Sequence, residues 1–169
     1  PNLGQSPQYV HADHHGYFFS PHNSNHIYIV SDGGVSKSED GGQSWTSLNN
    51  GLNISQSYGI AVSPEGDRVT SGTQDNGSQL YYGNASDWIE WQGGDGGYSA
   101  WDQQSGQYLY GSYVNGQMYG TDDRGLDSNR VRAMTLPDTD GAAFIQPFVL
   151  DDNNGNRMLV GTDNVFYTA

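Results

Sequence analysis

The hydrophobic positions of this chain alternate with polar ones over short stretches and show no sustained helical spacing. No window repeats apolar residues at i, i+3, i+4 and i+7 in the manner of an amphipathic helix. Runs rich in β-branched, aromatic and aliphatic residues, such as 26–30 and 157–161, are bounded instead by Gly, Pro, Asp and Asn. Such runs are typical of strands joined by tight turns. The pattern therefore predicts an all-β protein with almost no helix.

The predicted strands fall into a repeated unit of three or four strands joined by turns that contain Pro, Asp, Asn or Gly. The first strand of each copy ends close to Pro21, Pro64, Asp102 or Asp151, at spacings of 43, 38 and 49 residues. This is the size of a four-stranded propeller blade. We therefore expect one β-propeller-like domain over 1–169, with about four antiparallel blades. Their approximate ranges are 11–53, 54–95, 96–141 and 142–169.

The fourth copy stops after its third strand, which leaves two arrangements open. Residues 1–10, through a strand at 8–10, would complete the last blade and close a small ring. Alternatively, the chain is a segment of a longer propeller, and its open edges pair with further sequence or with another copy. We favour the segment. The chain begins at Pro1 rather than Met, so we expect it to be either processed or cut from something longer.

One tight turn has a physical reason at each position. In the stretch from Ser38 to Trp45, Asp40 is placed to bond backbone amides, and two glycines supply positive φ. The tryptophan ring is suited to burial against a sheet. The pattern S-x-D-G-G-x-[ST]-W resembles the Asp-box of sialidase-type and sortilin-like propellers. We expect a structural role for its fixed positions, which are Ser38, Asp40, Gly41, Gly42, Ser44 and Trp45.

Composition excludes several classes of function. The chain has 169 residues, 19 acidic against 6 basic, and a formal net charge of −13. Such a surface repels polyphosphate and anionic lipid, which argues against nucleic-acid partners and anionic membrane surfaces. The absence of cysteine excludes disulfides, thiolate metal sites and cysteine nucleophiles. No apolar run approaches the roughly 20 residues of a membrane span, so we expect no membrane insertion.

The stretch 11–15 concentrates candidate metal ligands. In a strand, His11, Asp13 and His15 would share one face and offer two imidazoles and a carboxylate to a divalent cation, while His14 would point the other way. The alternative is that these side chains bond turns at the mouth of the central channel. We favour that alternative and leave a divalent metal ion open as a cofactor.

Three aspartates, Asp32, Asp75 and Asp95, each lie in a glycine-containing turn. Two carboxylates that face each other across a cleft can act as acid and base on a glycosidic bond. The alternative is ordinary turn chemistry, since Asp before Gly is common in tight turns. Aromatic side chains near carboxylates and amides also suit sugar binding, although propeller aromatics often fill the space between blades. The candidate ligand-binding set is His11, Asp13, His14, His15, Asp32, Gln74, Asp75 and Asp95.

In order, the motifs H-x-D-H-H, D-G-G-V, the Asp-box, Q-D-N-G and G-G-D-G cover residues 11 to about 120. Together they resemble the Asp-box propellers related to sortilin and to xyloglucan-cleaving glycosidases. The resemblance implies a secreted, extracellular or periplasmic bacterial protein and a piece of a longer one. It leaves three functions open: a glycan- or protein-binding module at the channel face, a glycoside hydrolase or fragment of one, and a structural or assembly module. We favour the binding module.

Overall fold

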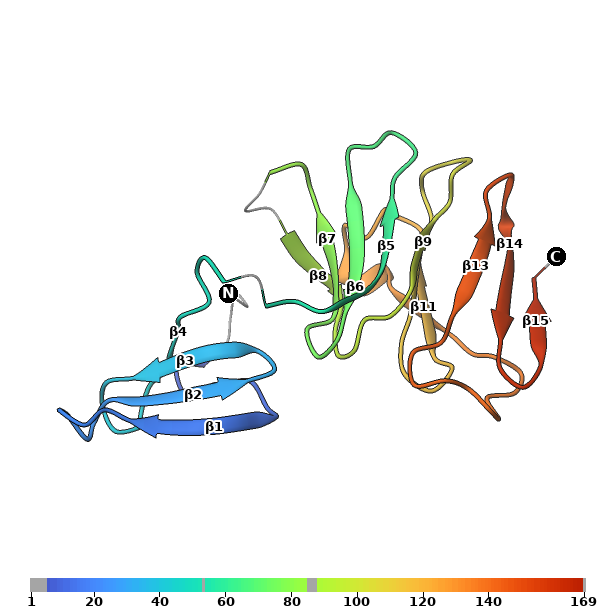
Figure 1. Cartoon of the computed structure of the whole chain (residues 1–169). Helices are drawn as coiled ribbons and strands as arrows, with labels where there is room; N and C mark the ends of the chain where they lie inside the picture. Colours follow the sequence, from blue (N-terminus) through green and yellow to red (C-terminus); the bar gives the residue numbers. More distant parts are fainter. Residues whose placement is uncertain (1–5, 53, 85–87, 169) are drawn as a thin grey trace. The chain divides into compact units, whose positions relative to one another are not determined.

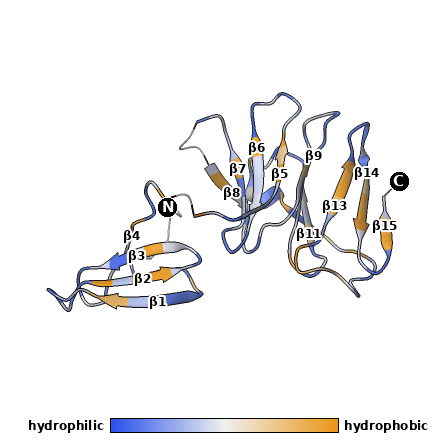
Figure 2. Ribbon diagram, viewed as in Figure 1, coloured by the Kyte–Doolittle hydropathy of each residue, from blue (hydrophilic) through white to orange (hydrophobic). Residues whose placement is uncertain are grey.

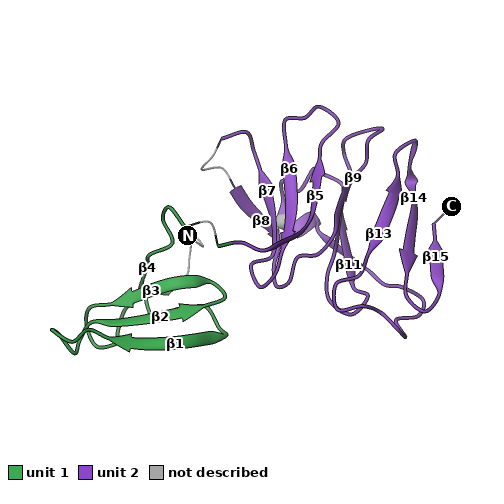
Figure 3. Ribbon diagram, in the orientation of Figure 1, with its two compact units in different colours: residues 1–54 green, residues 55–169 purple. Residues whose placement is uncertain are grey.

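The computed structural model describes residues 6–52, 54–84 and 88–168. The prediction of an all-β, blade-like fold is confirmed, because these residues form four successive antiparallel sheets. Within the described ranges there is no α-helix, only a 3-10 turn at Ser128–Arg130, and no helix long and apolar enough to cross a membrane. The chain divides into two compact units, residues 1–54 and 55–169 (Figure 3).

The first unit holds one four-stranded sheet in the order β1-β2-β3-β4 (Figure 1). Its strands are β1 (His14–Phe19), β2 (Ile27–Ser31), β3 (Gly34–Ser38) and β4 (Thr46–Ser47). The expected strand at 8–10 is not formed, since these residues lie in turn and coil. The segment adjoins the first sheet, because the Trp45 amide donates to the Pro7 carbonyl at 2.8 Å.

The second unit holds three sheets that follow one another along the chain (Figure 1). The first contains β5 (Ser57–Val62), β6 (Val69–Thr73), β7 (Ser78–Tyr81) and β8 (Trp88–Gln92). The next contains β9 (Ser99–Trp101), β10 (Leu109–Ser112), β11 (Met118–Thr121) and β12 (Arg132–Met134). The last has three strands, β13 (Phe148–Asp151), β14 (Asn154–Gly161) and β15 (Val165–Tyr167). Because β9 packs against both β5 and β13, the first strands of the three sheets adjoin.

Two apolar clusters fill the second unit. Leu80, Trp91, Trp101 and Leu109 pack between its first two sheets, and the Trp91 Nε1 donates to Thr70 Oγ1 at 3.0 Å. The two tryptophans thus fill the space between sheets, as propeller aromatics are expected to do. The second cluster joins the last two sheets and consists of Met118, Phe148, Met158 and Val160.

The last sheet buries only one of its faces. Figure 2 shows hydrophobic residues along β13, β14 and β15. Phe148 and Val160 are buried, yet Val165 is 72% exposed and Tyr167 is 74% exposed. This sheet therefore keeps an apolar surface that no described residue covers.

Candidate functional site

The turn between β3 and β4 is organised by one carboxylate. Asp40 accepts hydrogen bonds from Ser38 Oγ at 2.8 Å, from the Gln43 and Ser44 amides at 2.9 Å each, and from Ser44 Oγ at 2.6 Å. These bonds, with the Ser44 hydroxyl contributing most, lower the pKa of Asp40 to about 2. Asp40 is therefore an ionised turn organiser.

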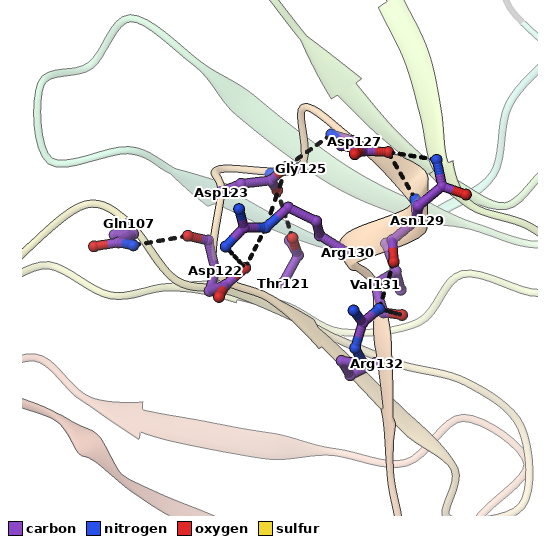
Figure 4. Close-up of polar contacts among 10 residues, drawn as sticks. All are labelled: Gln107, Thr121, Asp122, Asp123, Gly125, Asp127, Asn129, Arg130, Val131 and Arg132. Carbon is purple, nitrogen blue, oxygen red and sulfur yellow. Dashed lines mark hydrogen bonds and ion pairs between the residues drawn. The ribbon is translucent and has the colours of Figure 1, made fainter.

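The turn between β11 and β12 repeats this geometry, which the sequence analysis missed. Asp123 accepts bonds from Thr121 Oγ1 at 2.6 Å, from the Gly125 amide at 3.1 Å and from the Asp127 amide at 2.9 Å (Figure 4). Arg124 and Gly125 have φ of 67° and 76°, close to the 73° and 94° of the two glycines in the β3–β4 turn.

Even the backbone anchor matches between these two turns. The Arg124 amide donates to the Gln107 carbonyl at 3.0 Å, just as the Gly41 amide donates to the Asn25 carbonyl at 3.0 Å. The signal in the sequence was the T-x-D-x-G spacing. An arginine in place of the first glycine, and the lack of a tryptophan at the end, concealed it.

Two of the three candidate aspartates meet in the second unit. The backbone amide of Asp75, in the β6–β7 turn, donates to Asp95 Oδ1 at 3.1 Å. The two loops are also joined through their backbones, because the Gly77 amide bonds the Gly94 carbonyl at 2.7 Å and the Gly96 amide bonds the Thr73 carbonyl at 2.9 Å. The β6–β7 turn and the β8–β9 loop therefore form one surface, called here the 75–95 site.

The backbone at Asp75 is strained. Its φ is 60°, in the left-handed region that a non-glycine residue seldom adopts. Such conformations cost free energy and concentrate at functional sites, where the surrounding structure holds them in place. At this position the bonds from the β8–β9 loop provide that support.

Amide and aromatic groups surround the 75–95 site. Tyr58 donates its hydroxyl to Gln74 Oε1 at 2.7 Å, which fixes the orientation of that amide. The Tyr113 ring lies over Gly94, where a Cβ would sit 2.6 Å from the tyrosine hydroxyl. Tyr98, which follows the same loop, is 42% exposed. Carboxylate and amide groups thus lie on these two loops, and Tyr58 of β5 and Tyr113 of the β10–β11 turn bring phenol groups to them.

The remaining candidates lie in the first unit. His15 Nε2 bonds the Asp32 carboxylate, and His14 Nδ1 bonds the Tyr17 hydroxyl at 2.5 Å. His11 Nδ1 contacts the Ala12 carbonyl at 3.0 Å. These contacts occupy one ring nitrogen of each histidine. A cation at His15 Nε2 would have to displace Asp32 or share that carboxylate with it.

The expected strand face at 11–15 is not formed. The strand β1 begins only at His14, its pairing with β2 shifts register between His14 and Gly16, and Asp13 has a φ of 57°. A left-handed residue and a register shift break the alternation on which that prediction relied. The divalent-cation site at His11, Asp13 and His15 thus remains a prediction without that support.

The sequence matches no protein-family model and no curated protein. Among solved structures it is similar to an ancestral GH74 enzyme, with a TM-score of 0.55, 18% identity, and coverage of 92% of this chain and 22% of that one. It is also similar to the GH74 xyloglucanase from Xanthomonas campestris, with a TM-score of 0.51, 16% identity, and coverage of 92% and 28%. A third similar structure is YCF48 bound to a D1 peptide, with a TM-score of 0.51, 12% identity, and coverage of 85% and 46%.

These similar proteins are β-propellers, so the four sheets are propeller blades. Identities this low show a shared fold and nothing further. The chain spans less than half the length of each of these three structures.

Proposed function

We propose that this chain is a propeller module that binds a glycan through the 75–95 site, with Gln74, Asp75 and Asp95 as its polar contacts. The observation that carries the proposal is the bond from the strained Asp75 amide to the Asp95 carboxylate. It joins two turns, each with a carboxylate, into one surface on a rigid sheet framework. In a preorganised site, less free energy is spent on ordering the side chains and loops when a ligand binds.

The chemistry of this surface suits sugar hydroxyl groups. Carboxylate and amide oxygens accept hydrogen bonds, and the amide nitrogen of Gln74 remains a donor while Tyr58 occupies its oxygen. The exposed ring of Tyr98 offers an apolar face for the C–H groups of a sugar ring. The solved structures support a glycan, since one of them is named as a xyloglucanase. A protein ligand is the competing outcome, because YCF48 was solved with a peptide bound.

A second candidate function is glycoside hydrolysis, with Asp75 and Asp95 as acid and base. It is favoured by the meeting of these two residues on adjacent loops and by the GH74 names of two similar structures. A bell-shaped pH–rate profile on a xyloglucan oligosaccharide would support it. The absence of turnover by the full-length protein would contradict it.

Three further features remain proposals. We propose that the β3–β4 turn is an Asp-box of the sortilin-like and xyloglucanase-like propellers, which its bonding pattern supports. Secretion from a bacterial cell would follow from that membership. An assembly role is supported by the exposed apolar residues of β13–β15, which further blades of a longer chain or a second copy would cover.

Calorimetric titration with a xyloglucan heptasaccharide tests the proposed function. We expect Asp75→Asn and Asp95→Asn each to weaken binding about tenfold, the usual effect of losing a charge-assisted hydrogen bond. Asparagine tolerates the left-handed backbone, so the change at Asp75 should leave the fold intact. The matched control is Asp152→Asn, which removes the same charge in the exposed β13–β14 turn.

Two results would contradict the proposal. One is a wild-type chain that binds no member of a panel of neutral glycans. The other is equal affinity for the glycan in the wild type, in both site variants and in the control.

A further inference from the structure

A groove of about 440 Å³ lies over the sheet β9–β12 and shares no lining residue with the 75–95 site. Three of its residues are aligned across neighbouring strands: Tyr110 of β10 pairs with Gly120 of β11, which pairs with Arg132 of β12. Residues paired in this way project from the same face of a sheet. The ring of Tyr110 and the side chain of Arg132 therefore stand on either side of a glycine.

Gly120 forms the floor of this groove. A Cβ at this position would lie 3.0 Å from Tyr110 Cδ1 and 3.2 Å from Met134 Sδ. Any larger residue would therefore crowd the neighbours and fill the hollow. Tyr108, which is 40% exposed, also lines the groove.

The charges of the groove are unusual for so acidic a chain. Two of the six basic residues, Arg130 and Arg132, line it together with Asp122. Arg130 is held by Asp122, with Nη2 to Oδ1 at 2.7 Å and Nε to Oδ1 at 2.8 Å (Figure 4). The Asp122 charge is thus already compensated.

Arg132 forms no ion pair with a carboxylate among the residues that the structure describes. Its side chain is exposed, and its Nη1 donates only to the backbone carbonyls of Asn129 and Val131 (Figure 4). Every other lysine or arginine in the described ranges forms an ion pair within 4.0 Å, and Arg132 forms none there. Its guanidinium therefore keeps further N–H donors at the groove without a direct ion pair, although its charge also acts on Asp122 and Asp127 nearby.

We propose that this groove binds a sugar carrying a single carboxylate, with the guanidinium of Arg132 on the carboxylate and the tyrosines against the sugar ring. Arginine matches a carboxylate through two parallel hydrogen bonds. The volume lies in the usual range for small-ligand sites. The net charge of −13 on the protein disfavours a ligand with many negative charges. A ligand with a single carboxylate can instead pair with Arg132, which forms no ion pair among the described residues.

The position of the groove favours a compact ring over an extended peptide. Peptides that bind sheets in extended form usually pair with the backbone of an edge strand. Over β10 and β11 the groove lies on the sheet face, where the backbone groups are already paired within the ladder, and only its β12 side, with Arg132 and Met134, reaches an edge strand. Burial raises the pKa of Tyr110, so its hydroxyl remains a donor at neutral pH.

The test compares cellobiouronic acid with cellobiose, which differ only in a carboxylate at one C6 position. Calorimetry or NMR titration of the full chain should show about tenfold tighter binding of the acid. Arg132→Gln should abolish this preference, and Arg132→Lys, which keeps the charge and loses the planar fork, should retain part of it. The matched control is Arg157→Gln, which removes an exposed arginine from β14 and should leave the preference unchanged.

Equal affinity of the wild type for the two sugars would overturn the proposal. So would an equal loss of preference in Arg132→Gln and Arg157→Gln, since the effect would then be one of overall charge. Tight binding of a glutamate-rich peptide that depends on Arg132, without binding of the uronic acid, would replace the sugar by a peptide. Loss of xyloglucan binding at the 75–95 site leaves this inference untouched, because the two sites use different residues.

Discussion

Removal of the Asp102 carboxylate should destabilise the second unit through the turn between β9 and β10. Asp102 is only 3% exposed, and its carboxylate accepts bonds from the Gln104 amide at 2.9 Å, the Ser105 amide at 3.2 Å and the Ser105 hydroxyl. The space beyond it is closed by Gly155 of β14, where a Cβ would overlap the carboxylate. Asp102 therefore organises its own turn while it packs against the next sheet.

The expected cost of Asp102→Ala follows from these three bonds. At about 1 kcal/mol of net stability for each bond, the free energy of unfolding should fall by about 3 kcal/mol. This is more than a hundredfold change in the unfolding equilibrium, at about 1.4 kcal/mol for each factor of ten. Urea denaturation monitored by tryptophan fluorescence measures it, because Trp101 ends β9 next to this turn and its Nε1 donates to the Gly106 carbonyl at 2.8 Å.

Lowering the pH should also destabilise the fold, because it protonates the Asp102 carboxylate. Burial raises the pKa of Asp102, but the bonds from Ser105 and Gln104 outweigh burial and hold the pKa below its ordinary value. A carboxyl group whose pKa is lower in the folded state stabilises the fold above the unfolded pKa, and this stability is lost as the pH falls through the folded pKa. Below about pH 4, the free energy of unfolding of Asp102→Asn should therefore fall less steeply with decreasing pH than that of the wild type.

Asp152→Ala is the control for both experiments, because Asp152 is an exposed carboxylate in the β13–β14 turn. The free energy of unfolding of this Asp152→Ala variant should remain within about 0.5 kcal/mol of that of the wild type. An Asp102→Ala variant as stable as this control, or an unchanged acid profile in Asp102→Asn, would show that the Asp102 carboxylate does not stabilise the turn.

Two further substitutions test the packing between sheets. Leu80→Ala truncates a fully buried side chain and should cost about 2–5 kcal/mol in urea denaturation; a cost below about 1 kcal/mol would contradict the described core. Gly72→Ala would place a Cβ against the backbone of Gly97, so amide hydrogen exchange should lose protection across the β8–β9 loop. Gly161→Ala, whose Cβ meets nothing within 4 Å, should leave that protection unchanged, and equal exchange in both variants would argue against the contact.

The fold followed from the sequence because strand length, turn residues and blade spacing are local properties. Pro64 and Asp102 mark strand ends in the structure as they do in the sequence, and the turns at Asp32 and Asp75 lie between second and third strands. Asp75 and Asp95 were both selected from their turns. Their meeting through one hydrogen bond could not be predicted, because it depends on how two loops 20 residues apart pack.

The features that were not predicted from the sequence also have physical causes. A register shift at His15 and a left-handed Asp13 broke the alternation expected for 11–15, and neither feature has a distinct sequence signal. The second carboxylate-centred turn was concealed because Arg124 takes a backbone conformation normally left to glycine. The groove at Arg132 requires strand register, since only pairing places Gly120 beside that arginine.

The proposed function requires the 75–95 site to be the glycan-binding surface. NMR titration of the isotope-labelled chain with a xyloglucan heptasaccharide tests it most directly, because every non-proline backbone amide reports its own position. We expect saturable shifts confined to the β6–β7 turn, the β8–β9 loop and the adjoining tyrosines, with the amides of Asp75 and Gly96 among the largest. A spectrum that does not change, or shifts that gather on another surface, would contradict it.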